Sequence, residues 1–227
     1  MTVSTARVVG LVLGILIGSA ACSAGRQATE VRRLQARAAF ERGVKHFEAK
    51  EASQAMAALR EAVSLDPASA IYRDTLGLVF SQLQRPDLAL EQFREAVALD
   101  PQSGDAHFHL GVALAESTQW AEAVAAYRKA LALPTLTVPD LAHQNLGLAL
   151  YHLRQYPEAE QELRFAISLT PDMQAAYYHL GLVLVAERRL GEARAVLTRA
   201  RAMGRDTPFG EAAGLRLNSL GEDPSRP

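Results

Sequence analysis

The stretch AHFHLGVALAESTQWAEAVAAYRKALAL, residues 106–133, decides the fold because its pattern occurs five times along the chain. Its glycine belongs to a series with nearly constant spacing: Gly43, Gly77, Gly111, Gly147 and Gly181. Two alanines follow each glycine at fixed positions, as Ala123 and Ala130 follow Gly111, and between them stands a bulky residue, namely Leu59, Phe93, Tyr127, Leu163 or Leu197. A fixed period of this length predicts a repeat architecture.

Each repeated position has a structural reason. Small residues allow two antiparallel helices to approach closely, the bulky residue is expected to fill the space between hairpins, and a proline ends the second helix in three repeats. The pattern resembles the tetratricopeptide repeat (TPR). The resemblance implies an all-α, right-handed superhelical solenoid of helix hairpins, whose first helices line a concave surface that binds peptides or partner segments.

The repeat register divides the chain into predicted units. Five TPR units are expected at 36–69, 70–103, 104–139, 140–173 and 174–207. Residues 208–220 are predicted to form a capping helix, with Leu215, Leu217 and Leu220 available to cover the last hairpin, as a solenoid end requires. Residues 221–227 are predicted to be a disordered tail. This division leaves no room for a catalytic domain.

Composition narrows the function classes. The 227 residues carry a formal net charge of −1, so no broad basic field is present and a nucleic-acid partner is not expected. A single cysteine cannot form an intrachain disulfide, which excludes a disulfide-stapled domain.

The first residues have the layout of a secretory signal. Val8 to Ile17 is an apolar run with glycines, and it leads into Gly18-Ser-Ala-Ala-Cys22. Small residues before a cysteine resemble the lipobox of bacterial lipoproteins, although Ser19 stands where that family usually has an aliphatic residue. The resemblance implies a signal peptide over 1–21, a lipidated Cys22 that attaches the chain to a membrane, and a short tether and helix lead-in over 22–35. Because Ser23 is not Asp, it also implies the periplasmic face of the outer membrane.

Two other interpretations of this segment stay open. Val8 to Gly25 is free of charge, and its length is close to that of an uncleaved anchor in the inner membrane with a periplasmic domain. Alternatively, Cys22 lies by chance inside an ordinary cleaved signal. The stretch that follows is basic, which favours either contact with lipid phosphates or a solvated helix face.

The register also predicts which side chains face the concave surface. They include the expected partner-groove residues Phe108, His109, Gln144, Asn145, Tyr151, Tyr178 and His179. Cytosolic co-chaperone TPRs grip a carboxylate with lysines, and those positions here hold Phe40, Asp74, Phe108, Gln144 and Tyr178. An apolar groove favours an amphipathic helix or apolar strand of a protein partner. The alternative is that these aromatics pack between hairpins, as we expect for Trp120.

No catalytic, cofactor or metal site is predicted. His107 and His109 are two residues apart and diverge around a helix. His107 and His143 share a repeat position, but no acidic residue or cysteine at matching positions completes a metal site. A histidine-based metal carrier or enzyme is the alternative from a different functional class.

The third unit carries two extra residues, in Pro134-Thr-Leu-Thr-Val-Pro139. The two prolines predict a stiff junction that sets the angle between hairpins three and four, although a neutral insertion has the same sequence signature. With Asn145-Leu146-Gly147, this segment is similar to one in the type IV pilus biogenesis lipoproteins called pilotins. That resemblance implies a role in assembling an outer-membrane secretin; the alternative is a periplasmic adaptor for cell-wall or outer-membrane assembly machinery.

Overall fold

The structure, a computed structural model, describes residues 27–221, whose regular elements are all helices, with no strand among them. The helices are 27–48, α2 (Ala52–Leu65), α3 (Ala70–Gln82), α4 (Pro86–Leu99), α5 (Gly104–Glu116), α6 (Trp120–Leu131), α7 (Pro139–His152), α8 (Tyr156–Leu169), α9 (Gln174–Ala186), α10 (Leu190–Met203) and α11 (Pro208–Ser219). The predicted signal peptide with Cys22 and the predicted tail after residue 221 lie outside the described residues.

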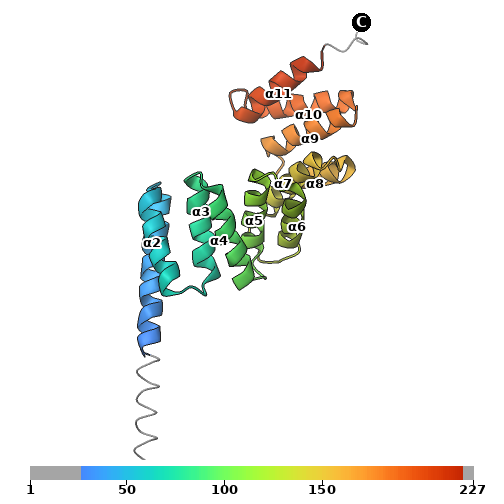
Figure 1. Ribbon diagram of the computed structural model, residues 1–227. Helices are drawn as coiled ribbons and strands as arrows, with labels where there is room; N and C mark the ends of the chain where they lie inside the picture. Colours follow the sequence, from blue (N-terminus) through green and yellow to red (C-terminus); the bar gives the residue numbers. More distant parts are fainter. Residues whose placement is uncertain (1–26, 222–227) are drawn as a thin grey trace, which may run out of the picture.

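Consecutive helices pack as antiparallel hairpins, and each hairpin packs on the next. In Figure 1 the helices from α2 to α6 stand side by side, whereas α9, α10 and α11 lie crosswise to them at the other end of the chain. The all-α solenoid of helix hairpins predicted from the sequence is therefore confirmed.

The repeated glycine and the repeated bulky residue contact each other within one hairpin. A Cβ built on any of the five glycines would lie 2.5–2.6 Å from the bulky side chain sixteen residues later, such as Phe93 for Gly77 or Leu197 for Gly181. We expected the bulky residue to fill the space between neighbouring hairpins. The structure shows that it also packs against the glycine of its own hairpin. Ordinary carbon contacts are about 3.5–4.0 Å, so the glycine sets how closely the two helices approach.

Each hairpin turns through one residue in the left-handed region. These residues are Lys50, Gln84, Thr118, Arg154 and Arg188, with φ between 55° and 62°. The following residue donates its N–H to the carbonyl five residues earlier, as in Gln155 N to Leu150 O at 2.9 Å, which closes the end of the first helix. None of these five turns uses glycine at this position, although glycine adopts this conformation at the lowest cost.

The proline-bounded insert folds back onto its own hairpin. The Thr135 hydroxyl accepts the N–H of Gly104 at 2.8 Å, and Thr137 N–H donates to the Asp105 carboxylate at 2.8 Å. A Cβ on Gly104 would lie 2.6 Å from the backbone nitrogen of Leu136. The insert therefore fixes the start of α5. The prediction of a stiff junction between hairpins three and four did not include this contact.

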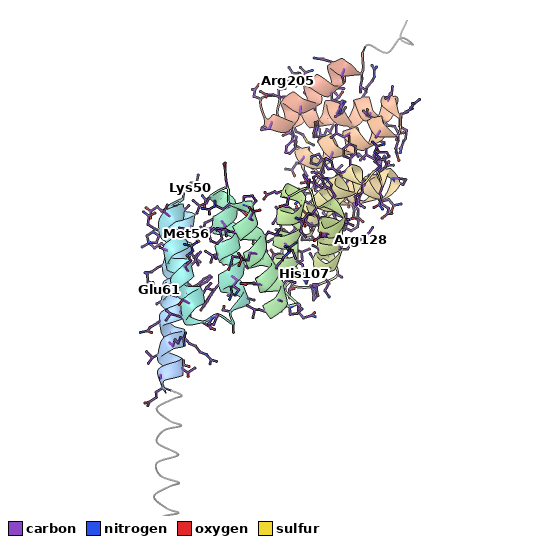
Figure 2. All side chains as sticks on the ribbon, viewed as in Figure 1. Lys50, Met56, Glu61, His107, Arg128 and Arg205 are labelled. Atoms are coloured by element: carbon purple, nitrogen blue, oxygen red, sulfur yellow. The ribbon has the colours of Figure 1, made fainter. Side chains whose placement is uncertain are left out.

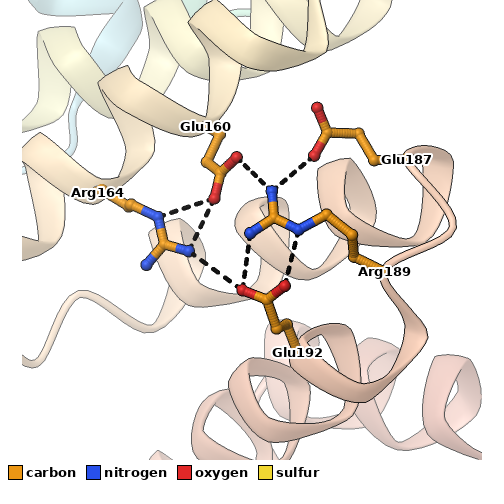
Figure 3. A network of polar contacts seen from close by, with 5 residues as sticks. All are labelled: Glu160, Arg164, Glu187, Arg189 and Glu192. Atoms are coloured by element: carbon orange, nitrogen blue, oxygen red, sulfur yellow. Dashed lines mark hydrogen bonds and ion pairs between the residues drawn. The ribbon is translucent and has the colours of Figure 1, made fainter.

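A network of ion pairs joins the fourth and fifth hairpins (Figure 3). Arg189, at the start of α10, lies 2.6 Å from Glu160 of α8, 2.9 Å from Glu187 and 2.7 Å from Glu192. Arg164 of α8 also contacts Glu160, at 2.7 Å. The bond from Arg189 is the main cause that lowers the pKa of Glu160. The network holds the turn of the last hairpin against α8.

Helix α11 covers the last hairpin with two of the three expected leucines. Leu217 and Leu220 pack with the buried Leu197, Ala200 and Ala213. Leu215 is 72% exposed, because it lies two residues before Leu217 and so points to the other side of the helix. The prediction that Leu215 covers the hairpin is wrong.

Candidate partner-binding surface

Two polar contacts cross between hairpins at the same repeat position. His109 Nδ1 lies 2.9 Å from an oxygen of Asp74, which joins α5 to α3. The Gln144 amide lies 3.1 Å from His179 Nδ1, which joins α7 to α9. In both pairs the partners are 35 residues apart, so each contact joins the first helix of one hairpin to the first helix of the next hairpin. The sequence placed these histidines and Gln144 on the groove, but it did not show that they bond to each other.

Burial sets the protonation of His179, the histidine of the second contact. Its side chain is only 7% exposed, and burial lowers its pKa to about 4, so the ring is neutral at pH 7. A neutral ring can accept a hydrogen bond at Nδ1 while the Gln144 amide donates. This buried amide–imidazole pair stabilises the junction of the last two hairpins.

The predicted groove residues therefore divide into two groups. Phe108, Gln144 and His179 are each no more than 8% exposed, so they offer a partner little surface. Asn145, Tyr151 and Tyr178 are partly exposed, as is His109. Three of the seven predicted groove residues are therefore buried, and the other four have exposed surface.

Tyr151 lies in a cluster of rings where the third hairpin meets the fourth. Its ring centroid is 5.5 Å from His152 and 5.9 Å from Tyr156. His152 stacks on Trp120 with a centroid distance of 3.9 Å and an interplanar angle of 8°. Trp120 packs against the main apolar core, which agrees with its interpretation as a core residue.

Tyr178 borders an open cleft that it shares with the capping helix. Its ring lies 5.8 Å from that of Phe209, and the cleft of about 290 Å³ is lined by Tyr178, Ala212, Leu215, Arg216 and Ser219. Exposed apolar surface, an aromatic ring and one guanidinium together suit an apolar segment that carries an acidic or carbonyl group. The role of α11 in lining part of a cleft was not predicted from the sequence. The one signal for it in the sequence was a third leucine, Leu215, in addition to the two that cover the hairpin.

His107 and His143 do not approach a common ion site. His107, on α5 (Figure 2), has its Nε2 3.2 Å from the Pro101 carbonyl, and burial lowers its pKa. His143 Nδ1 lies 2.5 Å from Glu162. Among residues 27–221, no group of three or more His, Cys, Asp or Glu side chains is placed to hold a metal ion.

Comparison with known proteins identifies the family. The sequence profile of the tetratricopeptide repeat matches residues 75–135 and 145–208, which is more than half of the chain. The chain belongs to the tetratricopeptide repeat family and is a scaffold of the class that binds peptides or proteins. Curated protein sequences give no significant match.

Solved structures with the same fold include MamA, PilW and PilF. MamA is 24% identical, with 74% of this chain and 91% of that chain covered and a TM-score of 0.67. PilW, described as a widely conserved type IV pilus biogenesis factor, is 22% identical. The match covers 82% of this chain and 85% of PilW, with a TM-score of 0.74. PilF of Pseudomonas aeruginosa is 24% identical. The match covers 84% of this chain and 93% of PilF, with a TM-score of 0.65. At these identities the likeness shows the fold alone.

Proposed function

We propose that this protein is a lipid-anchored TPR scaffold of the bacterial envelope that holds an apolar or amphipathic segment of another protein. The observation that carries the proposal is the cleft between Tyr178 and α11, where Leu215 is 72% exposed beside Arg216. An exposed apolar side chain that shares a cleft with an aromatic ring can serve as a binding contact.

The more specific proposal is a pilotin-like role, in which the bound segment belongs to an outer-membrane secretin subunit. It is supported by the lipobox-like sequence that ends at Cys22 and by the fold shared with PilW and PilF. In this proposal the protein is attached to the periplasmic face of the outer membrane, as the lipobox-like sequence followed by Ser23 implies. No helix within residues 27–221 is long and apolar enough to span a bilayer. In this proposal the attachment is the lipid on Cys22.

The test is a pull-down of the full-length protein at native expression level from detergent-solubilised membranes. Mass spectrometry identifies the proteins recovered and the N-terminus of the bait. A secretin subunit together with an acylated Cys22 is the expected result. Recovery of cell-wall enzymes or outer-membrane assembly proteins would instead favour a periplasmic adaptor, and an intact Met1 would contradict the lipoprotein attachment.

Two variants locate the binding surface. Tyr178→Ala combined with Leu215→Ser removes both apolar contacts of the cleft, and loss of such anchors typically costs about 2 kcal/mol or roughly thirtyfold in affinity. Leu99→Ser is the matched control, because Leu99 is 42% exposed at the end of α4, away from the cleft. Equal recovery of the partner by both variants would show that the cleft is not the binding surface.

A further inference from the structure

The first helix extends beyond the hairpin that it helps to form. Residues 27–35 are helical and every one of them is exposed, and the first buried residue is Ala36. At about 1.5 Å per residue this extension is about 13 Å long. The other first helices have 13 or 14 residues, whereas this one covers the whole range 27–48. The extension continues past the end of α2 (Figure 1).

The extension carries an apolar stripe. Val31 is 54% exposed and Leu34 is 59% exposed, and Ala38 continues the same face because the three residues are spaced by three and four. Leu34 and the buried Ala36 are two residues apart, so they point to nearly opposite sides of the helix. The apolar stripe therefore faces away from the packed side of the hairpin.

Basic residues flank the stripe. Arg32 and Arg33 lie within the extension and Arg37 follows one turn later, and the acidic residue of the same stretch is Glu30. Arg37 pairs with Glu41 at 2.9 Å, so Arg33 is the arginine on which the charge argument rests. Arg32 also donates to the Ser64 carbonyl at 3.1 Å, which holds the helix against the end of α2. A second copy would present the same basic face, so like charges would oppose self-association through it.

The chain before this helix indicates what covers the stripe. Val8 to Gly25 contains no charged residue, and residue 27 follows Cys22 by only five positions. Fully extended, that segment spans at most about 18 Å. If the N-terminus is held in a bilayer, the stripe lies within reach of the lipid headgroups.

We propose that residues 27–38 lie on the surface of an anionic phospholipid bilayer, with Val31 and Leu34 inserted between headgroups and Arg33 near phosphates. The inference rests on the membrane attachment proposed above. Amphipathic helices with a basic rim bind such surfaces in this way. Because the packed side of the helix faces away from the lipid, the remaining hairpins then extend from the membrane into the periplasm and leave the cleft at α11 far from it.

The test is amide hydrogen exchange on the full-length acylated protein in two kinds of vesicle, one of neutral phosphatidylcholine alone and one that also contains anionic phosphatidylglycerol as the minor lipid. We expect amides 29–36 to exchange about tenfold more slowly in the anionic vesicles, while amides of α11 are unchanged. Val31→Gln with Leu34→Gln retains good helix formers and should abolish the protection. Arg33→Gln, which leaves the bond from Arg32 to Ser64 in place, should reduce the difference between the two lipids. Leu169→Ser, which changes an exposed leucine at the end of α8, outside both the extension and the cleft, is the control and should change neither.

The outcomes separate this inference from the proposed function. Protein that floats with the vesicles but shows no lipid-dependent protection overturns the docked helix and leaves the attachment intact. Protein that does not float overturns both. Protection that arises without vesicles and increases with protein concentration would show contact with a second copy, and it would also overturn the inference.

Discussion

Substituting Gly181 by alanine should separate the two helices of the last hairpin. The new Cβ would lie 2.5 Å from both Cγ and Cδ2 of Leu197, which is about 1 Å inside ordinary carbon contact. Leu197 is fully buried, so its side chain has no open space to move into. Overpacking of this kind costs about 1–3 kcal/mol, and the better helix propensity of alanine returns about 1 kcal/mol. We therefore expect a net loss of up to about 2 kcal/mol in the free energy of unfolding.

The sign of this effect should reverse when Leu197 is truncated. Leu197→Ala alone should cost about 2–5 kcal/mol because it leaves a cavity. In that background the added methyl group no longer meets a side chain, so Gly181→Ala should stabilise the protein by up to about 1 kcal/mol. Urea unfolding followed by far-ultraviolet circular dichroism, applied to the four members of the double-mutant cycle, measures the coupling.

Gly191 provides the matched control. It lies in α10, where an added Cβ would meet no atom within 4 Å. Gly191→Ala should therefore stabilise the protein slightly, independently of residue 197. If Gly181→Ala costs the same in both Leu197 backgrounds, the glycine does not act through contact with Leu197 and the explanation of the repeat pattern fails.

Three further predictions follow from single positions. Arg154→Gly should raise the free energy of unfolding by about 1 kcal/mol, because Arg154 has a φ of 61°; an unchanged urea midpoint would contradict this. Gly104→Ala should speed amide exchange over residues 134–138, since its Cβ would meet the Leu136 backbone at 2.6 Å, and unchanged exchange would show that the insert does not depend on this contact. His179 has a pKa of about 4 when folded against 6.5 unfolded, so its contribution is complete above pH 6.5 and is lost as the pH falls towards 4. Wild type should therefore lose roughly 3 kcal/mol more than His179→Gln between pH 7 and pH 4 in urea unfolding, and equal losses would refute the buried neutral imidazole.

The repeat architecture could be predicted because its determining residues recur at a fixed spacing. Gly77 and Phe93, for example, are sixteen residues apart in the chain, and the same pair of positions appears in every repeat. Such a local and repeated contact is readable from one sequence. The structure gives the first and last residue of each helix, but the boundaries of the five repeat units stay a prediction.

The candidate site was less predictable because its contacts join different repeats. Burial of Gln144 depends on His179, which lies in the next hairpin. The cleft at Tyr178 depends on α11, which has no counterpart in the repeats to set its register. The fold-back of the insert depends on Thr135 reaching Gly104 across 31 residues. The spacing of Gln144 and His179 recurs in Asp74 and His109, but with different residue types, and the other two pairings have no counterpart in the repeats. The sequence could therefore identify residues of the right type but not their partners.

The most direct test of the central claim is site-specific photocrosslinking in cells, with a benzoylphenylalanine in place of Tyr178 or Leu99. The account predicts a crosslinked envelope protein at position 178, with the crosslinked peptide in an apolar or amphipathic segment, and none at position 99. Crosslinks at position 99 alone, or at neither position under conditions in which the partner is still co-purified, would contradict a binding surface formed by Tyr178 and α11.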